Sequence, residues 1–257
     1  MRVPDELPTI AASVLARLRE RRPRVHCITN SVAQAYTANA LLAVGAVPSM
    51  TVAIDEIGEF VAGADALLVN LGTMDPERHE AVGIAIEEAR ESGRPWVLDP
   101  VFVERSAPRA AFARGLIANT PAAVRMNAAE FTVLADAVPS EATCRALAEK
   151  WSTVVALTGS DDLVADGRRC AVLSNGDPLM AKITAMGCAG SAILAACLAV
   201  EPDAFLASVA GLLVVGVAGE MAAAHAAGPG SMSIGVIDAL HAIDAGHIAA
   251  RARTRPS

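Results

Sequence analysis

The chain has 257 residues, enough for one large α/β domain or two small ones, and its 53% of hydrophobic residues supports a large core without disulfides. The formal net charge of −7 argues against a nucleic-acid partner, because phosphates require a basic face. Only 3% of the residues are aromatic, so stacking platforms for bases are not expected. An ATP site is compatible with this composition, since it needs only a few cations and backbone amides.

Short β-like runs alternate with helical runs over the first 160 residues. Strands are predicted at 24–29, 47–51, 66–72, 95–100, 123–127 and 153–159. Helices are predicted at 31–45, 55–61, 76–92, 107–118, from 128 onward and at 140–151. Asn30 or Ser31 is the expected cap of the first helix, and Gly45 its stop. This alternation predicts an α/β fold with a mainly parallel central sheet and helices on both faces.

The last third of the chain changes pattern. Asp166 and Gly167 separate two apolar-rich runs, which is a hairpin signal and predicts an antiparallel edge to the sheet. After Gly187 the chain is predicted to be helical nearly to its end, and the basic tail 248–257 is expected to fray.

The most apolar stretch, residues 204–219, is the candidate for a membrane span. It has 16 residues, flanked by acidic residues at 201, 203 and 220, whereas a span needs about 20. We therefore expect a helix buried in a core or a subunit interface, and no membrane partner.

Cysteine usage and the N-terminal segment favour a cytoplasmic location. The five cysteines include no C-x-x-C pair, and an odd number is typical of a reducing compartment. Residues 1–20 contain acidic side chains and no long apolar run, so we expect no signal peptide.

Polar residues and glycines gather just after the predicted strands, where open α/β sheets bind ligands. They are Asn30, Asn70, Gly72, Asp99, Asn127, Glu130 and Thr158. For each of them the alternative is a helix cap or a turn residue.

Several common signatures are absent from the sequence. It contains no P-loop, no G-x-G-x-x-G after a strand and no G-x-S-x-G elbow. Its histidines are not spaced as metal ligands. Only His26, which lies in a predicted strand beside candidate site residues, remains a candidate functional residue.

Two acidic residues, one arginine and a helix start form a combination that is typical of phosphoryl transfer. Asp99 and Glu130, at neighbouring strand ends, suit a hydrated Mg²⁺, and Arg125 is placed to bind a phosphate bidentately. The stretch 182–196 supplies a helix N-terminus with free N–H groups for developing negative charge. Together they predict transfer from Mg·ATP without a P-loop.

The motifs "VHCITNSVAQAYTANALLAVGAVPSM", "ALLVNLGT", "PWVLDPV", "RMNAAE", "ALTG" and "AGPGS" occur in this order, and with them the chain resembles the hydroxyethylthiazole kinase family over roughly residues 23–242. The resemblance implies a single ribokinase-like kinase domain over 1–257. It implies transfer of the γ-phosphoryl of ATP to the hydroxyl of 4-methyl-5-(2-hydroxyethyl)thiazole in thiamine biosynthesis. It also implies a homotrimer with active sites between subunits.

The same resemblance assigns roles to individual residues. Asn30, Met50 and Ala185 correspond to substrate-binding positions, Arg125 and Thr158 to ATP-binding positions, Asp99 and Glu130 to positions near magnesium, and Gly187 and Cys188 to the catalytic helix start.

The helix start departs from the family pattern, in which Gly-x-Gly-Cys is usual. This chain reads Ala185-Met186-Gly187-Cys188, and a methyl group at 185 conflicts with a positive φ or crowds the thiazole. The backbone N–H groups are retained, so we expect retained chemistry.

The role of Cys188 is open on the sequence alone. A helix N-terminus is expected to lower the pKa of the thiol, and Cys188 either deprotonates the substrate hydroxyl or only positions it.

Two other functions are compatible with the sequence. One is a ribokinase-like enzyme for another small molecule, such as hydroxymethylpyrimidine, although such relatives usually have aspartate where Cys188 lies. The other is a non-catalytic trimer that binds thiazole or nucleotide.

Overall fold

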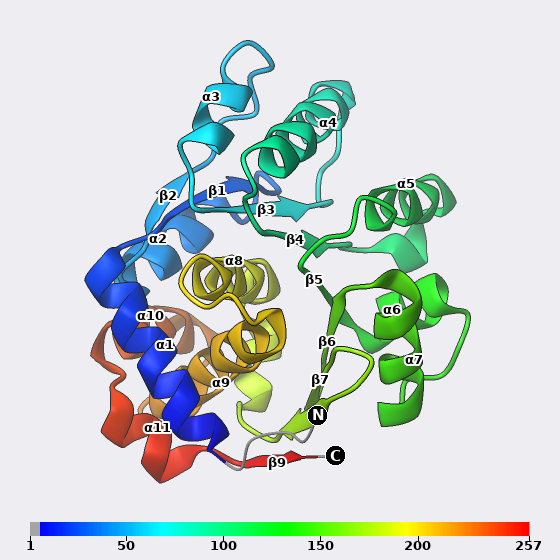
Figure 1. Ribbon diagram of the computed structural model, residues 1–257. Coiled ribbons are helices and arrows are strands. Elements are labelled where there is room, and N and C mark those ends of the chain that lie inside the picture. The colour runs from blue at the N-terminus through cyan, green and yellow to red at the C-terminus, as the bar shows by residue number, and fades with distance from the viewer. Residues whose placement is uncertain (1–5, 257) are drawn as a thin grey trace.

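A single nine-stranded sheet organises the computed structural model, which describes residues 6–256 (Figure 1). The strand order is β2-β1-β3-β4-β5-β6-β7-β8-β9, parallel from β2 to β6 and antiparallel from β6 to β9. The strands are β1 (Arg24–Ile28), β2 (Val47–Ser49), β3 (Ala66–Asn70), β4 (Trp96–Asp99), β5 (Ala123–Asn127), β6 (Val154–Thr158), β7 (Asp162–Ala165), β8 (Cys170–Leu173) and β9 (Thr254–Pro256). The predicted, mainly parallel sheet is confirmed, and so is the antiparallel hairpin, whose turn uses Gly167 at φ 85°.

Two hydrophobic clusters cover the two faces of the sheet because successive strand residues point to opposite sides. In β3, Ala66 and Leu68 belong to one cluster, and Leu67 and Val69 to the other. The larger cluster includes α1 (Leu7–Arg21), α2 (Gln34–Val44), α8 (Met186–Leu198), α9 (Ala204–Ala223), α10 (Pro229–Ala242) and α11 (Ala245–Arg251). The smaller one includes α3 (Ile57–Ala62), α4 (Pro76–Glu91), α5 (Ala107–Ile117), α6 (Ala128–Ala135) and α7 (Glu141–Trp151).

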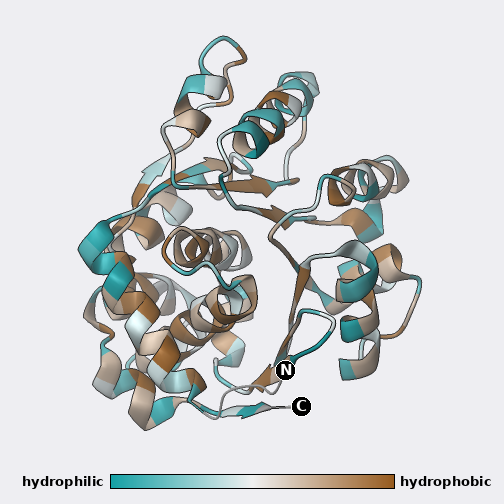
Figure 2. Cartoon of the chain, in the orientation of Figure 1, coloured by the Kyte–Doolittle hydropathy of each residue, from teal (hydrophilic) through white to brown (hydrophobic). Residues whose placement is uncertain are grey.

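Helix α9 is the apolar stretch predicted to be buried, extended to 20 residues. Within residues 6–256 it is the one helix whose length and composition match a membrane span, yet 78% of its most apolar window is buried inside the protein. It packs against α1, α8 and α10, and Figure 2 shows the hydrophobic colouring of α8 and α9. Its hydrophobicity is therefore explained by its place in the core.

The start of α2 differs from the prediction. The helix begins at Gln34 after Ala33, which provides no side-chain cap, so neither Asn30 nor Ser31 caps it. The side-chain amide of Asn30 instead donates hydrogen bonds to Asn70 and Cys188 inside the protein. The stop at Gly45, in the left-handed region at φ 108°, is confirmed.

The C-terminal tail is ordered, and the prediction that it frays is wrong. Helix α11 continues to Arg251, and β9 pairs with β8. The Arg253 backbone N–H donates to Asn175, and its guanidinium donates to the Ser174 carbonyl and to Glu220. At the other end, the expectation of no signal peptide falls in part on residues 1–5, which lie outside the described residues.

Candidate active site

The candidate site lies where the parallel strands end. The sheet register places Asn70 of β3 beside Asp99 of β4, and Asn127 of β5 beside Thr158 of β6. The strand-end residues predicted from the sequence therefore share one edge of the sheet, and α8 begins against it.

A buried hydrogen-bond network connects β3, β4 and α8. The Asn70 Nδ2 donates to Asp99 Oδ2 at 2.8 Å, and the Ser191 hydroxyl donates to the same oxygen at 2.7 Å. All three side chains are essentially inaccessible to solvent. Burial raises the pKa of Asp99, while the neighbouring Arg125 and the two hydrogen bonds oppose that rise.

Asn30 joins this network to Cys188. Its Nδ2 donates to Cys188 Sγ at 3.1 Å and lies 3.3 Å from Asn70 Oδ1, which also accepts from the backbone N–H of Gly72. A Cβ at Gly72 would lie 2.6 Å from that of Asn30, so only glycine permits this approach. Because the Asn30 amide bonds Asn70 and Cys188 and does not cap α2, the alternative that Asn30 is a simple helix cap is wrong.

Cys188 is a protonated thiol at neutral pH. Burial, followed by the negative charge of Asp99, raises its pKa to about 11, and hydrogen bonds from Asn30 and Asn70 only partly offset the rise. The expected lowering by the helix N-terminus is therefore wrong, because the thiol is desolvated beside a carboxylate.

The start of α8 offers a small group of backbone donors. The Met186 N–H donates to the Ile183 carbonyl, so the amides of Gly187 and Cys188 are the ones that the helix leaves without an acceptor. Ala185 adopts φ 71° and ψ 0°, so its methyl group does not exclude the conformation that glycine would take. The Met186 side chain is buried near the hydroxyl of Tyr36.

Arg125 of β5 points its guanidinium at the same helix start. A Cβ at Gly187 would lie 2.8 Å from Arg125 Nη1, so glycine is needed there for close approach. The buried Nε of Arg125 has no hydrogen-bond partner among the described residues. A buried guanidinium nitrogen without a partner is costly, and a half-buried arginine of this kind fits an anionic ligand.

Glu130 has a structural role as well as a place in the site. Its carboxylate accepts from the backbone N–H of Asn127 in a capping box and from that of Phe102. Burial, followed by repulsion from Asp99, raises its pKa to about 7.

No cluster of three or more potential metal ligands exists within residues 6–256. Asp99 and Glu130 alone do not form a complete cage. Two carboxylates fit a hydrated Mg²⁺ that arrives with nucleotide phosphates and keeps several waters.

A cavity of about 650 Å³ adjoins the start of α8 and is large enough for a nucleotide. Arg125, Thr158, Asp162 and Gly187 line its polar part, and Met180, Leu212 and Val215 its apolar part. Burial raises the pKa of Asp162 to about 6, although the Gly159 N–H and Arg125 stabilise its charge.

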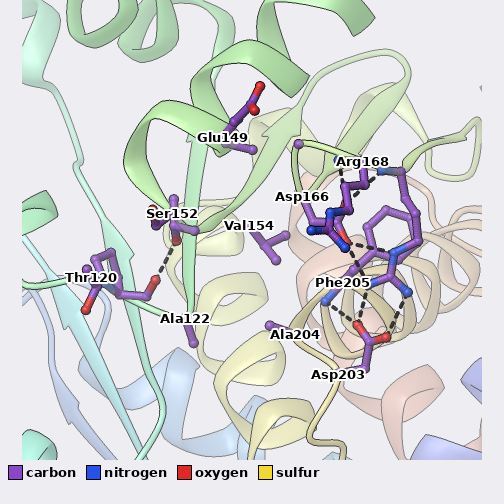
Figure 3. A pocket seen from close by; sticks show the side chains of 15 residues that line it. Thr120, Ala122, Glu149, Ser152, Val154, Asp166, Arg168, Asp203, Ala204 and Phe205 are labelled. Atoms are coloured by element: carbon purple, nitrogen blue, oxygen red, sulfur yellow. Dashed lines mark hydrogen bonds and ion pairs between the residues drawn. The ribbon is translucent and has the colours of Figure 1, made fainter. Parts of the chain in front are cut away.

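A second hollow of about 630 Å³ lies near the β7–β8 turn and the start of α9 (Figure 3). Asp166 and Asp203 there are joined by dashed lines to guanidinium nitrogens, which belong to Arg169. The guanidinium of Arg169 also lies over the ring of Phe205, at 4.3 Å from its centroid. These half-buried charges are paired with each other, so this hollow is not the candidate active site.

The network and the nucleotide-sized cavity bring together seven of the predicted site residues: Asn30, Asp99, Arg125, Thr158, Glu130, Gly187 and Cys188. Ala185 is the N-cap residue of α8 and does not line the cavity. Met50, just after β2, is half-buried against the larger hydrophobic cluster and does not line that cavity. Sequence reasoning missed Ser191 and Asp162. The only signal for Ser191 was a hydroxyl within an otherwise apolar helix.

Comparison with known proteins agrees with this geometry. The profile of the hydroxyethylthiazole kinase family matches residues 15–246. The chain is 44% identical to a probable hydroxyethylthiazole kinase of Agrobacterium fabrum, covering 96% of each chain, and 44% identical to hydroxyethylthiazole kinase of Granulibacter bethesdensis, covering 90% of this chain and 89% of the relative.

Solved structures of hydroxyethylthiazole kinase and of other ribokinase-like proteins also resemble this chain. The hydroxyethylthiazole kinase protein of Pyrococcus horikoshii OT3 superimposes with a TM-score of 0.93 at 34% identity, covering 97% of this chain and 99% of that one. A ribokinase-like superfamily protein of Enterococcus faecalis V583 has a TM-score of 0.65 at 13% identity, covering 91% and 93%, and it shows the fold alone.

The chain is an α/β protein with a ribokinase-like fold and a cavity at the carboxyl edge of its sheet. Within that class, the chain belongs to the hydroxyethylthiazole kinase family.

Proposed function

We propose that this protein is an ATP-dependent kinase that transfers the γ-phosphoryl group to the hydroxyl of 4-methyl-5-(2-hydroxyethyl)thiazole in thiamine biosynthesis. The observation that carries the proposal is the half-buried Arg125, whose buried Nε has no partner among the described residues. It lies against the start of α8, beside a cavity large enough for a nucleotide. Relatives at 44% identity carry the name of this activity.

In this proposal Arg125 and the amides of Gly187 and Cys188 hold the phosphates. Thr158 lines the nucleotide cavity. These groups are fixed before the reaction, so they stabilise the charge of the transferring phosphoryl group without reorganisation.

On the acceptor side, Asn30 and Cys188 receive the substrate hydroxyl, and Ala185 and Met50 contact the thiazole. Cys188 positions the hydroxyl as a neutral thiol, because its pKa of about 11 leaves very little thiolate at neutral pH. A loose phosphoryl-transfer transition state needs little assistance from a base, so positioning is sufficient.

Mg²⁺ is the proposed metal, carried with ATP and approached by Asp99 and Glu130. When bound, it neutralises charge on the phosphates and orients them. The two carboxylates suit this role because Asp99 ends β4 and Glu130 lies in the first turn of α6, within electrostatic reach of each other and of Arg125.

We also propose a cytoplasmic homotrimer in which residues 1–257 form one domain and the active sites lie between subunits. Edge strand β2 and its neighbours expose apolar side chains at Leu42, Val47, Ile54 and Phe60, which favours a covered surface. The five cysteines are free, as suits a reducing compartment.

A coupled assay of ADP release tests the proposed activity. The purified protein with Mg·ATP is offered the thiazole alcohol, hydroxymethylpyrimidine or pyridoxal, and the phosphorylated product is identified by mass spectrometry. We expect turnover with the thiazole alcohol well above the rate without acceptor. Faster turnover with another acceptor would assign a different kinase, and binding of ATP and thiazole without any ADP would assign a non-catalytic binding protein.

A further inference from the structure

Asp99 receives hydrogen bonds on one carboxylate oxygen from two different elements. Asn70 of β3 and Ser191 of α8 both donate to Oδ2, at 2.8 and 2.7 Å. This oxygen is fully engaged, and the lone pairs of Oδ1 are left for groups that enter the site.

Ser191 lies one helical turn after Gly187 and therefore on the same face of α8. Its hydroxyl is 2.7 Å from Asp99 Oδ2 and 3.3 Å from the Gly187 carbonyl. Since a hydroxyl has one proton, the shorter contact to a carboxylate takes it. Ser191 thus connects the helix start that presents the free amides to the strand end that presents the carboxylate.

A buried serine in a helix usually donates to the carbonyl four residues earlier. Ser208 of α9 does this, with 2.7 Å from its hydroxyl to the Ala204 carbonyl. Both serines are fully buried, but only Ser191 turns its hydroxyl toward a side chain in the site. A helix-packing role alone does not explain that orientation.

We propose that Ser191 is a positioning residue of the kinase, which fixes the Asp99 carboxylate relative to the amides at the start of α8. The inference rests on the proposed function, in which Asp99 approaches the magnesium and the phosphates. Without the Ser191 hydroxyl, Oδ2 keeps only the Asn70 donor, and the carboxylate is less firmly fixed relative to α8.

The test compares S191A and S191T with wild type, with S208A as the matched control. Kinetics give kcat and the KM for the thiazole alcohol, and calorimetry gives ADP affinity with and without Mg²⁺. We expect S191A to lower kcat about 10- to 100-fold, as is usual when a partner of a metal-binding carboxylate is removed. We expect the KM for the alcohol to remain unchanged and the gain in ADP affinity produced by Mg²⁺ to shrink.

S191T keeps the hydroxyl and should restore both readouts, whereas S208A should match wild type in both. If S191A does not fold, S191C replaces it, since it fills the same space with a much weaker donor. An S191A or S191C protein with wild-type kcat and wild-type Mg²⁺ dependence overturns the inference, and so does a loss that S208A shares. Failure of the proposed function is distinct, because then the wild-type protein itself shows no turnover.

Discussion

Cys188 shows how the surroundings of one side chain set its chemistry. The helix N-terminus favours a thiolate, but the cysteine lies in a desolvated position beside the negative charge of Asp99, and its pKa rises to about 11. The residue that the sequence offers as a base is therefore a neutral group held by Asn30.

Replacing Cys188 with alanine should therefore lower kcat far less than the loss of a general base would. A general base contributes about 10²- to 10⁴-fold, whereas loss of a neutral positioning group should lower kcat by about 10-fold or less. Steady-state kinetics with saturating Mg·ATP measure the effect. A fall of 10³-fold in kcat would assign proton transfer to the thiol.

Ala185 carries backbone strain, because φ 71° is a left-handed conformation that a Cβ disfavours. Ala185→Gly should raise the free energy of unfolding by about 0.5–1 kcal/mol, the relief of strain exceeding the entropy that glycine loses. Urea denaturation measures the change. Ala189→Gly, in the regular part of the same helix, is the matched control and should destabilise by about 1 kcal/mol or more. Equal destabilisation by both changes would show that Ala185 is not strained.

The packing of α8 on α9 depends on small residues. A Cβ at Gly211 of α9 would lie 3.0 Å from Leu194 Cα, which is backbone and does not move aside easily. At Gly190 of α8 the nearest atom is a Val215 methyl at 4.0 Å. Two glycines that look alike in the sequence thus have different roles in this helix pair.

Gly211→Ala should lower the free energy of unfolding by about 1–3 kcal/mol through overpacking. Gly190→Ala should be neutral or stabilise by up to about 1 kcal/mol through helix propensity. Both are measured by urea denaturation. Equal effects at the two positions would contradict the close contact between α8 and α9.

The stability of the whole molecule should depend on the buried ring of His26. Its Nε2 donates to the Thr51 carbonyl at 3.1 Å, and its Nδ1, 2.8 Å from Ser49 Oγ, accepts from that hydroxyl. The ring is therefore neutral, and burial lowers its pKa from 6.5 to about 4.

Above pH 6.5 the ring is neutral in the folded and the unfolded chain, so it has no effect on the pH dependence. As the pH falls from 6.5 toward 4, only the unfolded chain gains the proton, and the free energy of unfolding decreases. At pH 5 this loss should be about 2 kcal/mol relative to pH 7.5. Urea denaturation of wild type and of His26→Gln at both pH values measures this loss, since the variant has no imidazole ring to titrate. Parallel pH profiles would show that His26 is not buried as a neutral ring.

The proposed trimer is also a property of the whole molecule. Light scattering should give about three times the chain mass of 26.3 kDa. Phe60→Asp, on the exposed apolar surface beside β2, should reduce that mass because a charge would be buried in the interface. Val138→Asp changes another exposed apolar residue, located between α6 and α7; it is the control and should not change the mass. A wild-type protein of single-chain mass would contradict the assembly.

The alternation of strands and helices, the hairpin at Gly167 and the positions of most polar residues after strands could be predicted from the residue pattern. These features follow from local backbone preferences and from the side that each residue turns to the core, which the residue pattern records directly. The family resemblance added the expected roles of individual residues.

Which polar groups contact one another depends on the folded arrangement of the whole chain. Asn30 contacts Cys188 across 158 positions, and Ser191 contacts Asp99 across 92, so no local pattern reports either pair. The contact with Cys188 took Asn30 away from the cap of α2, and burial beside Asp99 raised the pKa of Cys188. Hydrogen bonding and desolvation depend on neighbours in space, and folding brings those neighbours together from distant parts of the chain.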